Sequence, residues 1–292
     1  MNASTKLLVF CRAIRPGLLA SAWFTAIAAG SPALAQSLQP TPPERVVPAP
    51  VQSRPLALPA SRQMVGIEIR GTITPRTLEQ VRQPLSRVAD SPHTDDAFPA
   101  GVLILLDSSG GDGMAAMEIG RLARAARAHV FVAGKCSSAC VLVFAGGAMR
   151  GAASGALGIH QGRVTRFVRD VGRQDVRVEA DEQARLFLEL ADRRTEEYLA
   201  EMGMPPTLIA ASRAVPADRV RWLDAAEIAE YGLSGFDPAY RASRAVAGAA
   251  RFGIDGEEFA RRSNVTADTC RVEATAVASF SACYRRVLAT GR

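Results

Sequence analysis

The sequence contains one serine and one histidine whose positions suit nucleophilic catalysis. Ser138 lies in the segment Gly134–Cys140, between a predicted strand and a predicted helix. A serine at such a turn is either a helix N-cap or a nucleophile, and the amide that follows a nucleophile can stabilise an oxyanion. His160 ends another predicted strand, 22 residues after Ser138. Because parallel strands end at the same edge of a sheet, His160 could act as the general base for Ser138.

The other two histidines are placed less favourably for this role. His93 lies in a predicted polar loop, and His129 begins its strand, at the opposite edge of the sheet. A glycine-rich segment, Asp107–Gly113, also follows a predicted buried strand. Its adjacent glycines let backbone amides face a crevice at the strand end, where open α/β sheets bind ligands. The alternative is a plain strand-to-helix turn. A P-loop is excluded, because no Gly-Lys-Ser/Thr follows.

The elements around these residues alternate between strand and helix. Strands are predicted at residues 65–69, 101–106, 129–133 and 156–160, with helices at about 75–89, 115–127 and 138–147 between them. The uninterrupted apolar run 101–106 is typical of a strand buried on both faces. This spacing predicts an α/β fold with a mostly parallel sheet and flanking helices. Further along, a long helix is expected at about 180–202, and Asp224–Glu227 is a capping box for a short one.

Composition and the N-terminus limit the class of protein. The chain has 292 residues, of which 48% are apolar, and a formal charge of +6, which excludes a wholly disordered or polytopic membrane protein. Residues 1–35 combine a basic start, an apolar stretch and the small-residue site Ala33–Ala35. This predicts a cleaved signal peptide, with an uncleaved membrane anchor as the alternative. Without the leader's three basic residues the count is 32 against 29, or +3, so nucleic-acid binding is not expected.

Two further features belong to the chain that remains after cleavage of the leader: a proline-rich segment and four cysteines. Seven prolines in residues 36–62 predict a linker without regular structure. Export would place four cysteines in an oxidising compartment, where an even number favours disulfides. We favour the local pairing, Cys136 with Cys140 and Cys270 with Cys283; free thiols and a metal site are the alternatives. No histidine lies within a few residues of either pair, so no metal is expected.

The pair around Ser138 has a geometric requirement. Side chains four residues apart on a regular helix have Cβ atoms roughly 5–6 Å apart, whereas a disulfide needs roughly 3.5–4.5 Å. A bridge between Cys136 and Cys140 therefore predicts a distorted turn around the serine.

Four segments, in this order, resemble the Clp protease proteolytic subunit within the ClpP/crotonase superfamily. They are Asp107–Gly111, Gly134–Ala139, Gly158–Gln161 and Leu223–Leu233, and the resemblance covers about residues 65–236. The leader and the Cys-x-Ser-Ala-Cys element are similar to those of exported, periplasmic bacterial relatives. The resemblance implies a ClpP/crotonase-like domain at residues 63–240. Residues 241–292 would be a small helical extension held by the second disulfide.

The resemblance also implies roles for single residues. Ser138 would be the nucleophile and His160 the general base, while the amides of Gly111 and Ala139 would form the oxyanion hole. A Ser–Lys pair built on Lys135, as in signal peptide peptidase A relatives, is disfavoured because His160 is present.

The sequence offers more than one candidate for the third member of a catalytic triad. The family has an aspartate three residues before the leucine that matches Leu223, and this chain has Val220 there. Asp218, two residues earlier, could reach His160 through a shifted loop and is the candidate. Asp224 and a Ser–His dyad are the alternatives.

Three functions compete. The first is an exported serine peptidase that hydrolyses peptides or unfolded proteins through an acyl-enzyme, without metal or organic cofactor. The second is a catalytically silent binding or scaffold protein of the cell envelope, favoured by the missing aspartate. The third, a crotonase-type thioester enzyme, is disfavoured because coenzyme A thioesters are cytosolic. The family forms rings or trimers, so a homo-oligomer is expected. An ATP-driven unfoldase is not, because an exported protein has no ATP supply.

Overall fold

The structure is a computed structural model that describes residues 38–40, 51–55, 65–90, 101–168, 172–176, 181–271 and 277–292. All of them belong to one compact unit, residues 36–292. The predicted leader at residues 1–35 and the loop with His93 lie outside the described residues. Among the described helices, none has the length and the apolar composition needed to cross a membrane.

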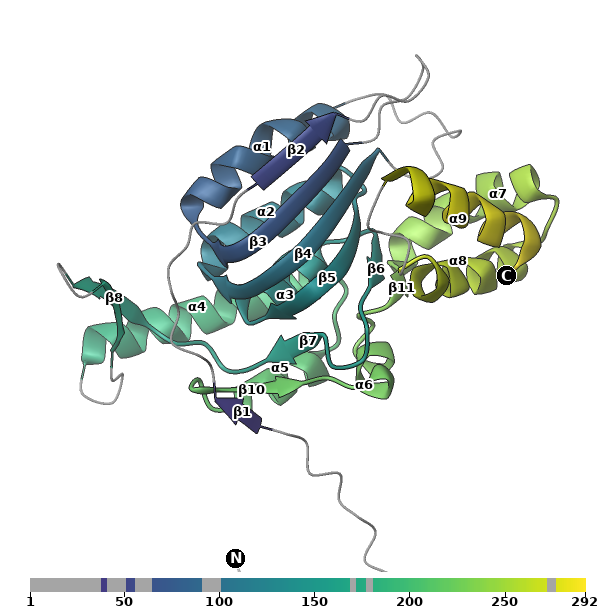
Figure 1. The fold of residues 1–292 in the computed structure, drawn as a ribbon. Helices are drawn as coiled ribbons and strands as arrows, with labels where there is room; N and C mark the ends of the chain where they lie inside the picture. Colours follow the sequence, from purple (N-terminus) through teal and green to yellow (C-terminus); the bar gives the residue numbers. More distant parts are fainter. Residues whose placement is uncertain are drawn as a thin grey trace, which may run out of the picture. The chain divides into compact units, whose positions relative to one another are not determined.

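A sheet with a parallel centre holds the fold together (Figure 1). Across the sheet the strands are β1 (Leu38–Pro40), β10 (Arg219–Trp222), β7 (Leu157–Ile159), β5 (His129–Ser137), β4 (Val102–Gly111), β3 (Val65–Ile73) and β2 (Val51–Pro55). Strands β3, β4, β5 and β7 are parallel, whereas β1, β10 and β2 are antiparallel to their neighbours. A branch continues from β5 to β6 (Met149–Gly151) and β11 (Gly235–Phe236).

Helices flank the sheet and complete the predicted architecture. Between the parallel strands lie α1 (Pro75–Ala89), α2 (Gly113–Ala125) and α3 (Ala139–Ala145). They are followed by the hairpin β8 (Thr165–Val168) and β9 (Gly172–Asp175), and by α4 (Glu182–Glu201), α5 (Pro206–Arg213) and α6 (Ala225–Glu230). The chain ends in α7 (Pro238–Phe252), α8 (Gly256–Thr269) and α9 (Val277–Thr290). The predicted α/β class, with a mostly parallel sheet and flanking helices, is confirmed.

Helix starts follow from local side-chain chemistry. Thr74 caps α1 and Asp112 caps α2, each with its side-chain oxygen on an amide of the first turn. Asp224 and Glu227 form the predicted capping box at α6. Such caps satisfy amides that a helix leaves without acceptors. They fix where each helix begins relative to the strand before it.

The central strands are buried on both faces. On β4, Ile104 and Leu106 contribute to the core that contains α1, α2 and α3, whereas Leu103 contributes to a second core formed with the C-terminal helices. On β5, Val130 and Phe131 divide in the same way. This explains the uninterrupted apolar run in the sequence, because a strand covered on both sides has no solvent-facing positions.

Two segments of the proline-rich stretch are strands. Residues 38–40 form β1 beside β10, and residues 51–55 form β2 beside β3, at opposite ends of the strand order. The expectation of a stretch without regular structure overlooked edge positions. Proline cannot donate a ladder hydrogen bond, but an edge strand has one side that needs no partner.

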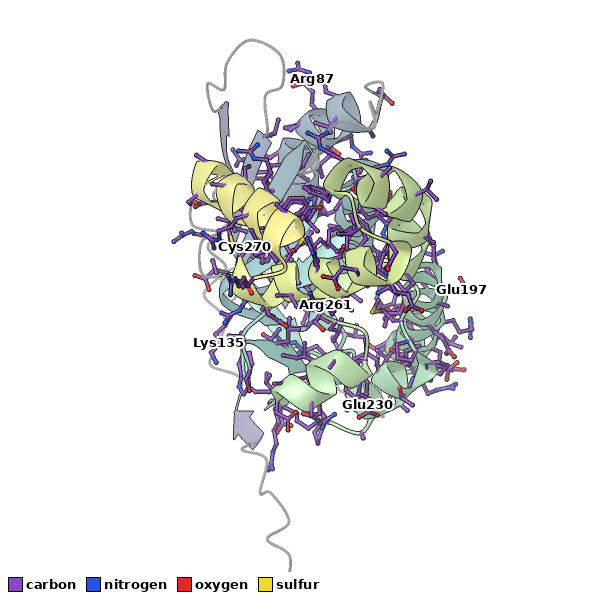
Figure 2. All side chains as sticks on the ribbon, turned by 90° about the vertical axis from the view of Figure 1, so that its right-hand side faces the viewer. Arg87, Lys135, Glu197, Glu230, Arg261 and Cys270 are labelled. Carbon is purple, nitrogen blue, oxygen red and sulfur yellow. A yellow bond between two sulfur atoms is a disulfide. The ribbon has the colours of Figure 1, made fainter. Side chains whose placement is uncertain are left out.

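The C-terminal helices pack against the sheet as a disulfide-held layer (Figure 2, Cys270 labelled). Cys270, at the end of α8, is bonded to Cys283 of α9. Their core includes Phe280 and Tyr284. Asp237, the N-cap of α7, is 3% exposed and pairs with Arg124 of α2 at 2.8 Å. This ion pair ties the start of the layer to the helices of the other face.

His129 lies inside this second core. The imidazole is fully buried and meets Phe236, Phe280 and Tyr284 edge-on, with ring centroids 5.4–5.9 Å away. Neither ring nitrogen has a hydrogen-bond partner among the described residues. Burial therefore lowers the pKa of His129 to about 3, because the charged form would lose its hydration. The ring is neutral and structural.

The pH dependence of stability should report this burial. The unfolded chain has a histidine pKa of about 6.5, and the folded protein has one of about 3. Between these values the unfolded chain binds more protons, so stability falls as the pH falls, by about 1.4 kcal/mol per pH unit. Lowering the pH from about 7 to about 5 should cost the wild type about 2 kcal/mol more than His129→Phe, measured by urea unfolding. Equal pH dependence in both proteins would contradict a buried neutral His129.

Candidate active site

Ser138 occupies a strained turn between β5 and α3. Its backbone angles are φ 56° and ψ −130°, a region that residues other than glycine rarely adopt. The Ser138 N–H donates to the Gly158 carbonyl at 3.0 Å, and the Ser138 carbonyl accepts from the Val141 N–H at 3.0 Å. The Ser138 side chain makes no capping hydrogen bond to α3. The N-cap interpretation therefore does not account for this serine, because its hydroxyl does not serve the helix.

The glycine pair at the end of β4 allows the main chain to approach this turn. Gly110 has φ +107°, and a Cβ there would lie 2.7 Å from the Ser138 Cβ. Gly111 has φ +139°, and a Cβ there would lie 2.2 Å from the Ile73 carbonyl oxygen. Real side chains do not fit at such separations, so this segment is more than a plain turn. Gly111 and Ala139 both line the same cavity as Ser138.

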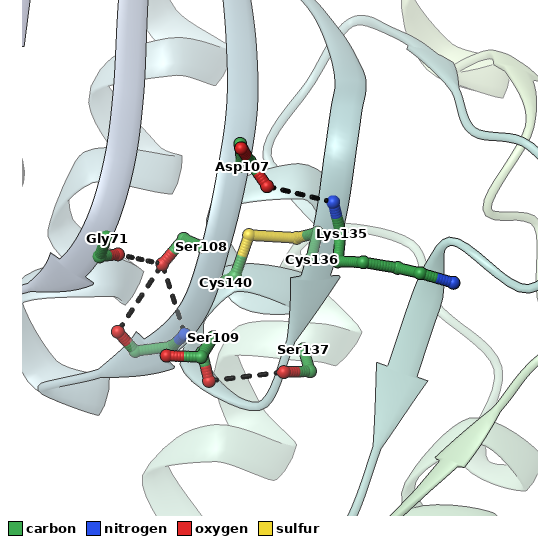
Figure 3. The surroundings of a disulfide bond; sticks show 9 residues. Gly71, Asp107, Ser108, Ser109, Lys135, Cys136, Ser137 and Cys140 are labelled. Carbon is green, nitrogen blue, oxygen red and sulfur yellow. Dashed lines mark hydrogen bonds between the residues drawn. A yellow bond between two sulfur atoms is a disulfide. The ribbon is translucent and has the colours of Figure 1, made fainter. Parts of the chain in front are cut away.

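The register between β4 and β5 shifts just before the turn. Leu106 pairs with Val132 and Ser108 with Cys136, so one residue of β4 faces residues 133–135 of β5. The Asp107 carboxylate fills this gap and accepts the Lys135 backbone N–H at 3.0 Å (Figure 3). A side chain on the residue before Lys135 would collide with that carboxylate, since a Cβ on Gly134 would lie 2.2 Å from Oδ1.

The first disulfide closes the turn. Cys136 at the end of β5 is bonded to Cys140 in the first turn of α3, with the two Cα atoms 5.3 Å apart (Figure 3). The sequence predicted a distorted turn here, and the structure has one at Ser138, where φ is positive and the bridge joins a strand end to a helix start. Beside it, the Ser137 hydroxyl donates to the Ser109 carbonyl at 3.2 Å. The strand end, the turn and the helix start are thus held on both sides of Ser138.

Lys135 has a role away from the serine. Its ammonium donates to the Gly155 carbonyl and lies 4.6 Å from the centroid of the Trp222 ring. Figure 3 shows its side chain pointing away from the disulfide. The contacts are a hydrogen bond and a cation–π interaction. The Lys135 amine is therefore engaged elsewhere and is not positioned as a base for Ser138.

His160 follows β7, the parallel neighbour of β5. Ser137 pairs with Gly158, so Ser138 and His160 lie close together where the two strands end. The imidazole is half-buried, and its Nδ1 lies 2.7 Å from the Gln161 carbonyl oxygen. Burial lowers the pKa of His160, the positive charge of Arg163 lowers it further, and the Gln161 carbonyl opposes both. His160 is therefore neutral near pH 7, the state that a general base requires.

Neither candidate for the third member of the triad is among the described residues that line the cavity of Ser138 and His160. Asp218 is exposed, in the turn before β10, and is not among the described residues that line the cavity. Asp224, the alternative, is the N-cap of α6, and its carboxylate accepts the Glu227 N–H at 2.9 Å. Among the described residues, no strand pairing brings either carboxylate to His160. Val220, in contrast, is buried and lines the cavity.

Ser138 and His160 line a cavity that also has an apolar wall. It measures about 860 Å³ and is lined by residues of β4, α2, the Ser138 turn, the His160 loop, α4 and α5. Buried apolar side chains form much of its inner wall: Met117, Leu142, Leu199, Leu208 and Ile209. Phe187 of α4 is 58% exposed and also lines it. A serine, an imidazole, the main chain of Gly111 at a strand end and of Ala139 at a helix start, and an apolar wall are suited to acyl transfer on a partly apolar substrate.

Several features of the site were not anticipated from the sequence. The roles of Asp107 and Gly110, and the α4 and α5 wall, come from register and packing across elements. Asp107 and the glycine pair were visible as an unusual strand end, which was the available signal. Within the described residues, no group of three or more His, Cys, Asp or Glu side chains is arranged to hold a metal ion.

Comparisons with known proteins give a likeness of fold. No model of a known protein family matches the chain, and no curated protein matches it. Among solved structures, the chain is similar to a mutant of ClpP1 from Listeria monocytogenes, at 19% sequence identity and a TM-score of 0.43. That match covers 58% of this chain and 88% of the other. A likeness at this level of identity concerns the fold and does not extend to activity.

Removing the first disulfide should slow the chemistry of Ser138. A positive φ at a non-glycine residue costs about 1–3 kcal/mol, so the turn persists only while its surroundings impose it. In Cys136→Ser/Cys140→Ser we expect modification of Ser138 by a fluorophosphonate to be roughly tenfold slower, or more, than in the wild type.

The second disulfide provides the matched control. Cys270→Ser/Cys283→Ser removes a bridge with a sequence separation of 13 residues, outside the cavity. It should lower the free energy of unfolding by about 2–4 kcal/mol while leaving the modification rate within about twofold. Equal rates in both double variants would show that the first bridge does not organise the turn.

Proposed function

We propose that this chain is a ClpP-like serine hydrolase that cleaves peptide bonds through an acyl-enzyme on Ser138. The observation that supports the proposal is that Ser138 and His160 follow the paired ends of adjacent parallel strands and line one cavity together with Gly111 and Ala139. Three of the four motif segments that resemble the ClpP/crotonase superfamily support the same assignment, because they contribute these four residues.

The chemistry follows the usual order for an activated serine. His160 Nε2 takes the hydroxyl proton as Ser138 Oγ attacks the peptide carbonyl carbon, and the carbonyl oxygen becomes an oxyanion near Gly111 and Ala139. The imidazolium then gives its proton to the amine, and the C–N bond breaks, which leaves an ester on Ser138. Water, deprotonated by His160, adds to this ester, and the acid product leaves as the serine regains its proton.

The proposal also includes a class of substrate and a cellular compartment. The apolar wall favours short or unfolded peptides, whose side chains are free to enter the cavity. Two disulfides and the predicted leader support export to an oxidising compartment such as the bacterial periplasm. In that setting no ATP-dependent unfoldase takes part. A homo-oligomer is proposed from the family resemblance.

A second candidate function is a catalytically silent binding protein that keeps the fold and the cavity. The observation in its favour is Val220, an apolar residue at the position where the resembling family has an aspartate. In this case the same cavity would hold a peptide without cleaving it.

Covalent labelling separates the two functions. Oxidised, purified protein should react with a fluorophosphonate probe at Ser138, and the adduct should be located there by mass spectrometry. Ser138→Ala should abolish the label, and His160→Ala should slow labelling by roughly 100-fold or more, the usual contribution of a positioned base. His129→Phe is the matched control and should label like the wild type. A folded wild type that does not label would favour the silent binding protein.

The apolar wall makes a prediction about substrates. A leucine side chain gains about 1.5–3 kcal/mol on burial, which corresponds to roughly a 10- to 150-fold preference. In a fluorogenic peptide pair that differs only in the residue before the scissile bond, leucine should therefore give a kcat/KM at least tenfold above that of aspartate. Equal values for the two peptides would show that this wall does not select the substrate.

A further inference from the structure

The hydrogen bond of the His160 ring is made to the main chain. Nδ1 lies 2.7 Å from the carbonyl oxygen of Gln161. A carbonyl oxygen can only accept, so this contact requires a proton on Nδ1. In the neutral ring Nε2 is then the unprotonated nitrogen, which is the state in which it can take a proton from a serine hydroxyl.

The accepting carbonyl is itself held in place. The Gln161 N–H donates to the Val215 carbonyl at 2.9 Å, so the peptide unit just before the acceptor is anchored to the segment that leads into β10. The residue before His160, Ile159, is fixed by β10 through its pairing with Arg221. The imidazole is thus flanked by two anchored positions, and the acceptor does not depend on a flexible side chain.

The strand beside His160 offers no carboxylate at the corresponding position. Gly158 pairs with Trp222 and Ile159 with Arg221, so one further antiparallel step places Val220 opposite His160. Val220 is 4% exposed, and a Cβ on Gly158 would lie 2.5 Å from its Cγ1. Val220 is therefore packed onto β7 at the place from which a third triad member would reach the ring.

Charged groups from other elements also surround the loop. Arg163 follows His160 on the same loop and lowers its pKa. Asp192 of α4 faces the loop, since a Cβ on Gly162 would lie 3.1 Å from its Oδ1, and burial raises its pKa. Asp218 precedes β10 at the surface. The ammonium of Lys135 from β5 is directed to Gly155 and Trp222.

We propose that the main-chain carbonyl of Gln161 is the positioning group that holds His160 with its proton on Nδ1, in place of a carboxylate. The catalytic role of this carbonyl rests on the proposed function, whereas the hydrogen bond between His160 Nδ1 and the Gln161 carbonyl is independent of it. A neutral carbonyl orients the ring as an aspartate would, but it stabilises the imidazolium less, because it carries no full charge. The pair Ser138–His160 would then work as a dyad oriented by the backbone.

The tautomer can be read directly by NMR, without substrate. In protein labelled with ¹⁵N-histidine, the two ring nitrogens have distinct shifts when protonated and unprotonated, and the spectrum of His160→Ala identifies the His160 signals. Near pH 7.5 we expect the proton on Nδ1 and a free Nε2. A proton on Nε2 with a free Nδ1 would overturn the proposal. Either result stands whether or not Ser138 reacts with a fluorophosphonate, so it is separable from the proposed function.

Two variants test what orients the ring. Asp218→Asn, a surface change, should keep the Nδ1–H tautomer, the His160 titration midpoint and the labelling rate within about twofold. A loss of the tautomer or a 100-fold fall in labelling would instead make Asp218 the third member and overturn the proposal.

Val220→Asp supplies the carboxylate that the strand lacks. It should raise the His160 titration midpoint by about one pH unit or more, because a nearby opposite charge favours the imidazolium, and labelling of Ser138 should become faster. An unchanged midpoint in the folded variant would show that position 220 does not face the ring and would count against the proposal. Val220→Asn is the matched control, since it has the same shape without the charge. If a substitution at position 220 prevents folding, the NMR measurement of the wild-type tautomer and the Asp218→Asn variant still test the proposal.

Discussion

The close approach of the main chain at the end of β4 to the turn after β5 is the constraint on which the site depends. Gly110 lies against Ser138 and Gly111 against the carbonyl of Ile73, at distances that exclude any side chain. Because β4, β5 and β7 are parallel, this contact brings a glycine-rich strand end, a serine and an imidazole to one edge of the sheet. The Asp107 carboxylate at the register shift and the bridge from Cys136 to Cys140 hold the serine turn in that contact.

The two faces of the sheet have different roles: one lies next to the candidate site, and the other contributes to the core with the C-terminal helices. One face carries the helices next to the cavity, and the other is covered by the C-terminal layer through Leu103 and Phe131. No described residue of α7, α8 or α9 lines the cavity. As far as its described residues go, the extension is therefore not part of the cavity wall. It buries the second face of strands that a single layer of helices would leave exposed, and it encloses the neutral ring of His129.

The pattern of the sequence was sufficient for the α/β class, for the strand ends that meet and for most helix boundaries, because apolar periodicity and capping residues are local signals. The edge strands β1 and β2 were missed, since their pairing depends on distant partners and not on their own proline-rich composition. The placement of Asp218 away from the cavity, and of Val220 opposite His160, follows from the register of β10 on β7, which no local pattern reveals. The hydrogen bond from His160 to the Gln161 carbonyl could not be predicted either. Every residue has a main-chain carbonyl, so the residue type does not show which one accepts a hydrogen bond.

The position of β1 and β2 at the two ends of the strand order has a consequence for behaviour in concentrated solution. An exposed edge is a template on which another chain can add a strand, and such additions lead to aggregation. Both end strands are short and finish at a proline, Pro40 in β1 and Pro55 in β2, which has no amide hydrogen to donate. On the branch, α8 packs against β6 and β11. The proline-rich segments β1 and β2 therefore give the sheet edges to which a further strand is less easily added.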